Sequence, residues 1–306
     1  MHPVSLKAVC SVDISLLIIR YAYQLLESFS FLVLASLGLA IIFGMMGVIN
    51  QAHGEFIMLG AYIFCAANTA GVPFLISVLL ATAGVALYGF IIDRLIIKRL
   101  YSRLIDSVVV TWGISLIMTQ TIKQLFGPSF TSPAVPLGTI QYGSSSFSIY
   151  RIVLIVFSVA LLGGLYYLFN HTTFGLHSRA TMQKSDIAEG LGINTKFTYS
   201  MTFVIGSGLA GLCGALYAPL MAVTPEFGQS FIIQSFTAVV VGGAEPLMGT
   251  LFSSGALGVV NGVLSLRISQ FIGKVGMLIV AIIFIRVLPG GFSGVLGKIK
   301  VRRKKG

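Results

Sequence analysis

The chain has 306 residues, of which 56% are hydrophobic and only 9% are charged, and its mean hydropathy is +0.95. A soluble globular domain has about a quarter of its residues charged, so this composition excludes a water-facing surface of the ordinary kind. The net charge of +11 could indicate a nucleic-acid-binding protein, but the placement of the basic residues in separate loops argues against that class. The composition predicts a polytopic membrane protein.

Apolar runs recur along the chain at the length that a membrane-spanning helix needs, about 20 residues. In chain order they cover 29–49, 56–92 (long enough for two spans), 107–125, 150–169, 198–223, 230–266 and 271–288, after a weaker stretch at 8–26. No run shows the alternating polarity of a membrane β-barrel strand. We therefore predict an all-α polytopic integral membrane protein, one domain over residues 1–306, with about eight to ten spans. Whether residues 1–27 cross the membrane is left open, and they lack the pattern of a removable signal peptide.

The basic residues gather in three places, which predicts the orientation of the chain. They lie in a loop around residues 94–103, in a second loop at 179–196, and in a basic tail at 295–306. Loops rich in Lys and Arg stay on the cytoplasmic side of a membrane. The uncharged segment 126–148 is therefore predicted to be external. The pattern predicts a cytoplasmic C-terminus, contact with membrane lipid and no nucleic-acid partner.

The sequence contains no motif for catalysis, metal binding or ATP hydrolysis. Its three cysteines have no paired spacing, so they predict neither a disulfide framework nor a metal site. His53 and Glu55 have the H-x-E spacing of zinc deaminases but lack the C-x-x-C pair that completes that site. A G-x-S-x-G elbow and a G-x-x-x-x-G-K-[ST] phosphate loop are also absent. We predict no catalytic residue, no metal and no bound cofactor, and the chain is not expected to be an enzyme.

Two apolar segments, one in each half of the chain, are interrupted by glycines and polar residues. The segment 39–62 breaks at VINQAHGE, and the segment 236–260 breaks at GGAEP. Non-helical backbone at membrane depth is tolerated only against protein or a watery cavity, and paired interruptions point to the binding region of a transporter. We predict discontinuous helices of an inverted internal repeat, with a translocation path lined by Asn50, Gln51, His53, Gly54, Glu55, Gly242, Gly243 and Glu245. An ordinary surface loop at 50–55 is the alternative that the segment alone leaves open.

Two further segments have a predicted structural role. In GSGLAGLCGAL, residues 206–216, small residues recur at four-residue spacing, which lets helices approach closely in lipid. The polar segment 172–200 has Asp186 and Glu189 on one face of a short helix, which glycines would end. We expect this cytoplasmic segment to dock a partner; a solvated loop helix is the alternative.

Three segments in this order resemble the membrane permeases of ABC importers of the branched-chain amino-acid type. They are VINQAHGEFIMLGAY, AEGLGINTKFTYSMTFVIGSGLAGLCGAL and VVVGGAEPLMGTLFSSGALGVVNGVL, and the likeness extends over most of the chain. Two other segments, TWGISLIMTQ and GKVGMLIVAIIFIRVLPGGF, look more like the urea and short-amide branch of that family than the leucine branch.

The resemblance implies a permease subunit of the bacterial cytoplasmic (inner) membrane. Its partners would be a second permease, usually a different chain, two cytoplasmic ATPases that use ATP, and an external solute-binding protein. The loop at 185–197 matches the ATPase-contacting segment of the family, which makes four residues coupling candidates: Asp186, Glu189, Gly190 and Gly192. The N-x-A-H-G-E signature of the family matches residues 50–55, although Gln51 departs from the Met or Phe expected there. In the second half, Glu245 makes the linker more polar than is usual in the family.

The main interpretation is therefore the permease subunit of an ATP-driven importer for urea or a short amide. One alternative keeps the importer but makes the solute a branched-chain amino acid. The other alternative, from a different class, is an ion-coupled transporter or passive channel. It would use a buried carboxyl group, for which Glu55 and Glu245 are the candidates.

Overall fold

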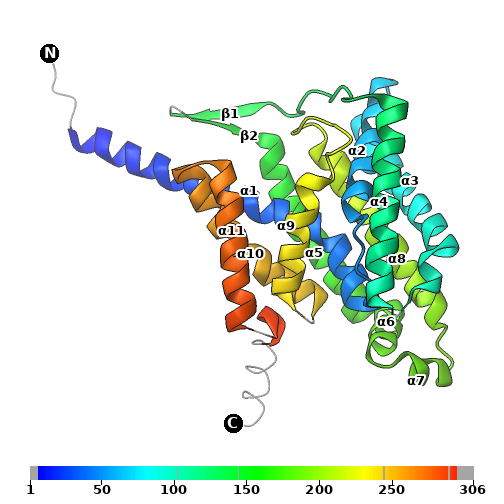
Figure 1. The fold of residues 1–306 in the computed structure, drawn as a ribbon. Coiled ribbons are helices and arrows are strands. Elements are labelled where there is room, and N and C mark those ends of the chain that lie inside the picture. The colour runs from blue at the N-terminus through cyan, green and yellow to red at the C-terminus, as the bar shows by residue number, and fades with distance from the viewer. Residues whose placement is uncertain (1–5, 102, 144, 244, 289, 295–306) are drawn as a thin grey trace, which may run out of the picture.

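The computed structural model describes residues 6–101, 103–143, 145–243, 245–288 and 290–294. The predicted basic tail at 295–306 and residues 1–5 lie outside the described residues. The elements in chain order are α1 (Leu6–Met46), α2 (His53–Thr69), α3 (Phe74–Leu95), the 3-10 helix η1 (Ile97–Arg99), α4 (Leu104–Phe126), β1 (Thr139–Tyr142), β2 (Ser145–Ser148), α5 (Ile149–His171), α6 (Thr173–Gln183), α7 (Ser185–Gly190), α8 (Thr195–Tyr217), α9 (Gln229–Gly242), α10 (Pro246–Arg267) and α11 (Gln270–Val287) (Figure 1).

The predicted all-α polytopic class is confirmed. Within the described residues, seven helical stretches are long and apolar enough to cross a membrane: Ile14–Met46, Phe74–Arg99, Leu104–Phe126, Ile149–His171, Thr195–Tyr217, Leu247–Arg267 and Gln270–Gly294. This number is lower than the predicted eight to ten because α2 and α9, with 17 and 14 residues, are shorter than a full span of about 20.

Helix α1 joins two stretches that the sequence separates. The weak apolar stretch at 8–26 and the strong run at 29–49 form one helix of 41 residues, because no proline or glycine interrupts residues 6–37. Residues 6–27, whose role the sequence leaves open, are thus the first part of α1. Figure 1 shows this part extending away from the helix bundle.

Helix α8 is the element on which α1, α2 and α3 pack. The backbones approach closely at glycines: a Cβ added at Gly38 of α1 would overlap the carbonyl oxygen of Gly206 in α8. A Cβ at Gly60 of α2 would likewise overlap the carbonyl oxygen of Gly211. The predicted packing role of the small residues at 206–216 is therefore confirmed, since close approach of helices in lipid requires residues of this size.

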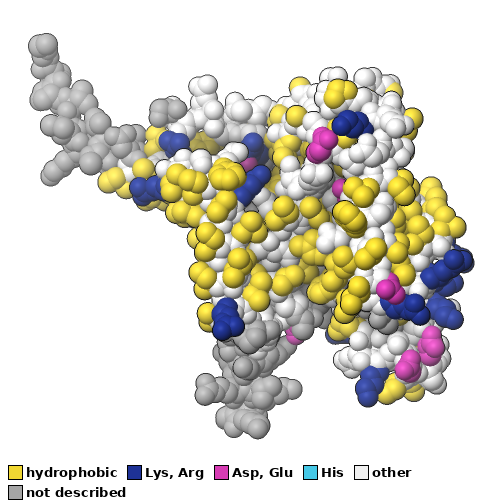
Figure 2. All heavy atoms as spheres, viewed as in Figure 1, with side chains coloured by type: hydrophobic (Ala, Val, Ile, Leu, Met, Phe, Trp, Pro, Cys, Tyr) yellow, Lys and Arg dark blue, Asp and Glu magenta, His cyan; other side chains and the backbone are white. Residues whose placement is uncertain are grey.

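The two largest hydrophobic cores among the described residues both include residues of α1. The larger core joins α1 to α2, α3 and α8 and includes Phe56 and Phe203, and the smaller core joins α1 to α9, α10 and α11 around Leu32 and Met277. Helix α1 therefore connects the two groups of helices that are seen at the right and the left of Figure 1. In the space-filling view, hydrophobic side chains cover the middle of the molecule, as expected for a lipid-facing surface (Figure 2).

The predicted external segment 126–148 contains two β-strands, which were not expected from the sequence. Strands β1 and β2 form an antiparallel hairpin in which Thr139 pairs with Ser148 and Tyr142 with Ser145. Phe130 of the same segment forms an isolated bridge with Val223 of the loop that follows α8. We call this side of the molecule the hairpin end, and the opposite side, which carries α6 and α7, the α7 end (Figure 1).

The interruption predicted at 242–246 exists, but its geometry differs from the prediction. Helices α9 and α10 fold back on each other, with the hydroxyl of Ser253 donating to the carbonyl of Ala238 over 2.5 Å. The chain reverses at Gly243, whose φ of +85° favours glycine. Gly242 packs directly on Gly249 across the turn. The segment 236–260 is thus a helical hairpin rather than one discontinuous spanning helix.

The glycine packing predicts opposite effects of the same substitution at two sites. Gly60→Ala forces the backbones of α2 and α8 apart and is expected to destabilise the fold by about 1–3 kcal/mol. Gly164→Ala in α5 is the matched control, because a Cβ there meets nothing within 4 Å. The better helix propensity of alanine should leave that variant unchanged or about 1 kcal/mol more stable. Thermal unfolding of the two purified variants in detergent checks this, and equal stability would contradict the packing argument.

Candidate functional site

The first interruption lies between α1 and the first turn of α2. We call residues 47–55 the break. Helix α1 ends at Met46, Gly47 turns the chain with a φ of +62°, and α2 begins at His53. Asn50 and His53 are fully buried and Glu55 is 5% exposed. The surface-loop alternative for residues 50–55 is therefore wrong: the polar side chains face the protein interior, as the cost of polar groups in an apolar solvent requires.

Helix α4 supplies the hydrogen bonds that the break cannot make within itself. The backbone N–H of Ile49 donates to Ser107 Oγ over 3.3 Å, and the N–H of Gln51 donates to Thr111 Oγ1 over 3.0 Å. One turn further along α4, Ser115 forms a side-chain hydrogen bond with Glu55. The three hydroxyls recur at four-residue spacing and so lie on one face of α4, opposite the break.

His53 bonds to a carbonyl of α1 that also accepts a hydrogen bond from the second half of the chain. Its Nε2 lies 3.0 Å from the carbonyl oxygen of Ala35 in α1, so this nitrogen carries the proton and donates. The hydroxyl of Ser235 in α9 donates to the same carbonyl oxygen over 2.9 Å. A single carbonyl of α1 thus accepts hydrogen bonds from α2 and from α9, although residues 35 and 235 are far apart in the sequence.

The beginning of α2 lies directly against the loop before α9. A Cβ added at Gly54 would lie 2.6 Å from the carbonyl oxygen of Gly228, so the two backbones are in contact. The irregular segment 218–228, and not the predicted segment 242–246, is therefore the part of the second half that meets the first break.

Three buried polar atoms at the break have no hydrogen-bond partner among the described residues. They are Asn50 Nδ2, His53 Nδ1 and Glu55 Oε2. Asn50 uses its Oδ1 to accept from the N–H of Ala52 over 3.0 Å, and Gln51 is only partly buried. Unpaired buried polar groups are rare in native proteins. Their concentration within six residues marks the break as the candidate functional site.

The residues predicted in the second half lie away from this site. Gly242 is at the far end of α9, roughly 20 Å along the helix from its start at Gln229. Gly243 packs on the backbone around Gly290 and Gly291, and Glu245 is exposed. The structure thus brings Asn50, Gln51, His53, Gly54 and Glu55 together and keeps Gly242, Gly243 and Glu245 at a separate place.

The predicted coupling segment forms α7 and the turn after it. Asp186 is in the first turn of α7, and both it and Glu189 are exposed. Glu189 accepts a hydrogen bond from the hydroxyl of Thr195 at the start of α8. Gly190 is the last residue of α7, and Gly192, with a φ of +87°, turns the chain toward α8. Glu189 and Gly192 therefore fix the position of α7 relative to α8.

A buried carboxylate holds the α7 end together. Asp93 of α3 accepts from the hydroxyl of Tyr101 and from the hydroxyl of Ser200, each over 2.6 Å. Burial and the hydrogen bond to Asp93 raise the pKa of Tyr101, which keeps its hydroxyl protonated and able to donate. The basic loop at 94–103 is thereby fixed against the beginning of α8.

The partners of the break are not among the predicted site residues. Ser107, Thr111 and Ser115 carry a signal in the sequence, because their hydroxyls recur at four-residue spacing in an apolar helix. Gly228 and Ser235 carry no such signal, since only the tertiary structure brings them to α1 and α2. Within the described residues, no group of three His, Cys, Asp or Glu side chains could hold a metal ion.

The chain is similar to known permease proteins over most of its length. Residues 21–288 match the family described as the branched-chain amino acid transport system permease component. The chain is 27% identical over 289 residues to the high-affinity branched-chain amino acid transport system permease protein LivH of Salmonella typhimurium strain LT2, covering 88% of this chain and 92% of the relative. It is 27% identical to a probable LivH of Methanocaldococcus jannaschii (86% and 89% covered) and 28% identical to BraD of Pseudomonas aeruginosa (74% and 79% covered). No solved structure is significantly similar.

The match with the family covers both interruptions, the α7 segment and every predicted site residue. The chain therefore belongs to the family of branched-chain amino acid transport system permease components.

Proposed function

We propose that this chain is the permease subunit of an ATP-driven importer of branched-chain amino acids. A second permease, two ATPase subunits and an external solute-binding protein would complete the importer, and the ATPases would use the ATP. The names of the relatives support this solute, since LivH and BraD are both branched-chain amino acid permease proteins. They give no support to the urea or short-amide solute that was predicted from the sequence.

The observation that carries the proposal is the exposed apolar surface formed by α7 and Leu191, the residue that follows it. Ile187 is 56% exposed and Leu191 is 77% exposed, while Ala188 anchors the helix in the protein. Lys and Arg side chains lie at both ends of the molecule (Figure 2), but the two basic loops around residues 94–103 and 179–196 both lie at the α7 end, which supports a cytoplasmic position for it. An exposed apolar surface in water is typical of a docking site, and we assign its partner as the ATPase subunit.

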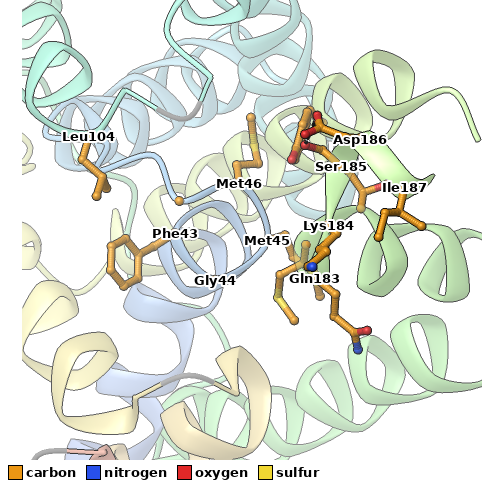
Figure 3. A pocket seen from close by; sticks show the side chains of 14 residues that line it. Phe43, Gly44, Met45, Met46, Leu104, Gln183, Lys184, Ser185, Asp186 and Ile187 are labelled. Carbon is orange, nitrogen blue, oxygen red and sulfur yellow. Dashed lines mark hydrogen bonds between the residues drawn. The ribbon is translucent and has the colours of Figure 1, made fainter. Parts of the chain in front are cut away.

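A cavity beside α7 offers the route by which docking would act on the break. Its volume is about 740 Å³, and it is lined on one side by Phe43 to Gly47 at the end of α1 and on the other by residues 181–187 (Figure 3). Gly47 is also the first residue of the break. A displacement of α7 by the ATPase would therefore change the cavity and press on the chain where the break begins.

An ion-coupled transporter remains the competing function, and one observation favours it. Glu55 is buried with an oxygen that lacks a partner among the described residues. A carboxyl group in that position can take up a proton during transport. Uptake assays separate the two functions.

The assembled importer is expected to accumulate labelled leucine in proteoliposomes only when ATP is supplied on the ATPase side. Labelled urea should not accumulate, because the relatives that support the solute are named for amino acids. Urea uptake in place of leucine would overturn the solute but keep the importer. Leucine uptake by the purified chain alone, without ATP, would contradict the proposal and direct attention to Glu55.

Ile187→Asp is expected to uncouple the chain from its ATPase. A charge in the centre of an apolar contact should weaken association by about tenfold or more, with a matching loss of ATP-driven uptake. Leu176→Asp in α6 is the matched control, because Leu176 is 58% exposed and lies outside α7. Co-purification of the ATPase with each variant is the measurement. Unchanged co-purification of the Ile187 variant would reject α7 as the docking surface.

Thr111→Val tests whether the break must keep its shape for transport. The substitution preserves volume but leaves the N–H of Gln51 without its acceptor, which should cost about 1–3 kcal/mol in unfolding free energy and reduce uptake. Thr121→Val, at an exposed position of the same helix, should leave both quantities unchanged. Wild-type uptake by the Thr111 variant would show that transport does not depend on the shape of the break.

A further inference from the structure

A second cavity lies at the hairpin end, apart from the break. It measures about 250 Å³ and is lined by α1, α5, α9, α10, α11, the last residue of α8 and the residues that follow it. Its polar lining includes Glu27, Arg151, Gln234, Asn261 and Lys274. We call it the hairpin-end cavity. Its size is below the 300–1,000 Å³ or so of sites for drug-sized ligands and suits a small solute.

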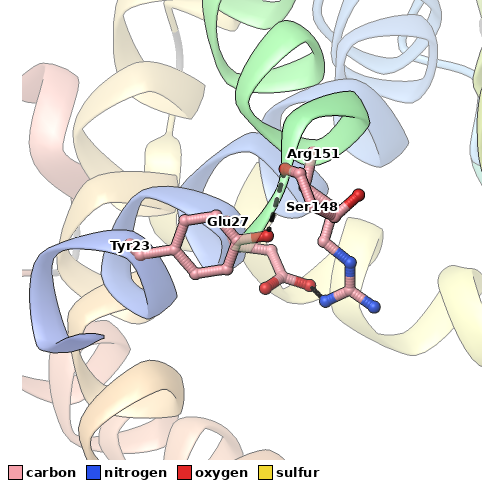
Figure 4. Close-up of polar contacts among 4 residues, drawn as sticks. All are labelled: Tyr23, Glu27, Ser148 and Arg151. Atoms are coloured by element: carbon pink, nitrogen blue, oxygen red, sulfur yellow. Dashed lines mark hydrogen bonds and ion pairs between the residues drawn. The ribbon is translucent and has the colours of Figure 1, made fainter. Parts of the chain in front are cut away.

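Both signs of charge are present in this cavity. Arg151 of α5 donates to Glu27 of α1, and Tyr23 fixes the same corner through its hydroxyl, 3.5 Å from the carbonyl of Ser148 (Figure 4). The side chains of Arg151 and Glu27 are 36% and 21% exposed, so the pair faces the cavity without being fully solvated. Lys274 of α11 adds a second cation, which forms no ion pair within the described residues.

Two acceptor atoms at this cavity lack partners among the described residues. Gln234 is 5% exposed and its Oε1 has no hydrogen bond, and Glu27 Oε2 is also unpaired. A buried polar atom without a partner costs free energy that a bound donor would recover. The two atoms therefore indicate a ligand that brings N–H or O–H donors into the cavity.

The floor of the cavity is aromatic. Phe31 and Tyr217 line it, their ring centroids are 5.2 Å apart, and Phe31 stacks on Phe231 at 5.0 Å. Such a surface favours an apolar group. The cavity thus combines a carboxylate with an unpaired amide oxygen, two cations, and an apolar floor.

We propose that the hairpin-end cavity binds an amino acid as its zwitterion, before the solute reaches the break. The carboxylate of the solute would pair with Arg151 and Lys274, its ammonium group with Glu27 and Gln234, and its side chain would lie on the aromatic floor. A zwitterion can enter between Glu27 and Arg151 and leave each charge paired, whereas an uncharged amide such as urea cannot. The inference rests on the proposed function and adds the place and chemistry of solute recognition.

The position of the cavity on α1 connects it to the break. Glu27, Phe31 and Ala35 recur at four-residue spacing and so lie on one face of the helix. The carbonyl of Ala35 is the acceptor for His53 and Ser235. A solute bound at Glu27 therefore contacts the helix face that, two turns further along, accepts the hydrogen bonds of His53 and Ser235.

The test exchanges the two charges. The double variant Glu27→Arg/Arg151→Glu keeps an ion pair between α1 and α5, but the positive charge now lies on α1 and the negative charge on α5. In the complete importer with leucine-loaded binding protein, we expect leucine uptake to fall by at least about tenfold, because each charge of the solute then meets a charge of the same sign. ATP hydrolysis stimulated by the loaded binding protein should persist, because the pair is not assigned to docking. Wild-type uptake by the exchanged pair would show a merely structural ion pair and overturn the proposal, and so would a joint loss of uptake and stimulation.

A second pair of variants does not depend on the ion pair. Gln234→Leu removes the unpaired amide and should raise the half-saturating leucine concentration several-fold without loss of folded protein, since an unsatisfied buried group is removed. Gln229→Leu, at an exposed position of the same helix, should have no effect. If the wild-type importer takes up no leucine, the proposed function fails. If it does and both cavity variants behave as wild type, only the cavity assignment fails.

Discussion

The close approach of α8 to α1 and α2 at glycines is the constraint on which the rest of the structure depends. In lipid no hydrophobic effect drives helices together, so contact must come from van der Waals packing between surfaces that fit. Gly206 and Gly211 let the backbones of Gly38 and Gly60 come into contact with α8. This contact fixes where α2 begins, and therefore where the chain must cross from the end of α1 to His53.

The break between α1 and α2 follows from that position. Its backbone groups lie in the protein interior, where each unpaired donor or acceptor costs about 1–3 kcal/mol. Ser107 and Thr111 of α4 meet part of this need, and the carbonyl of Ala35 meets another part by accepting from His53. Asn50, His53 and Glu55 each keep one buried polar atom without a hydrogen-bond partner among the described residues. Hydrogen bonding in the protein interior is therefore incomplete at the break. Such a place suits a subunit that changes conformation, because the unpaired groups can gain partners in a second arrangement of similar free energy.

Helix α1 lines both cavities, one near each of its ends. The residues Gln24 to Phe31 line the hairpin-end cavity, and Phe43 to Gly47 line the cavity beside α7. Between them, roughly 18 Å of helix is packed against α8 and accepts the hydrogen bonds of His53 and Ser235 at Ala35. In the proposed importer, solute recognition at one end and the ATPase at the other would act on the same rigid element, which is how packed helices transmit a displacement.

The sequence by itself determined the membrane class, most of the spans, the packing role of residues 206–216 and the family, because hydropathy, glycine spacing and motif order are properties of the chain that any fold of it must accommodate. It also favoured an inward position for Asn50, His53 and Glu55, since lipid excludes them, although the segment alone left an ordinary surface loop as the alternative. It could not decide which segment of the second half meets them. GGAEP and the chain before α9 are both irregular, and only the contact of Gly54 with Gly228 selects the latter. The roles of Ser235, Gln234 and the Glu27–Arg151 pair were likewise decided by the tertiary structure, because each depends on helices that are distant in sequence and adjacent in space.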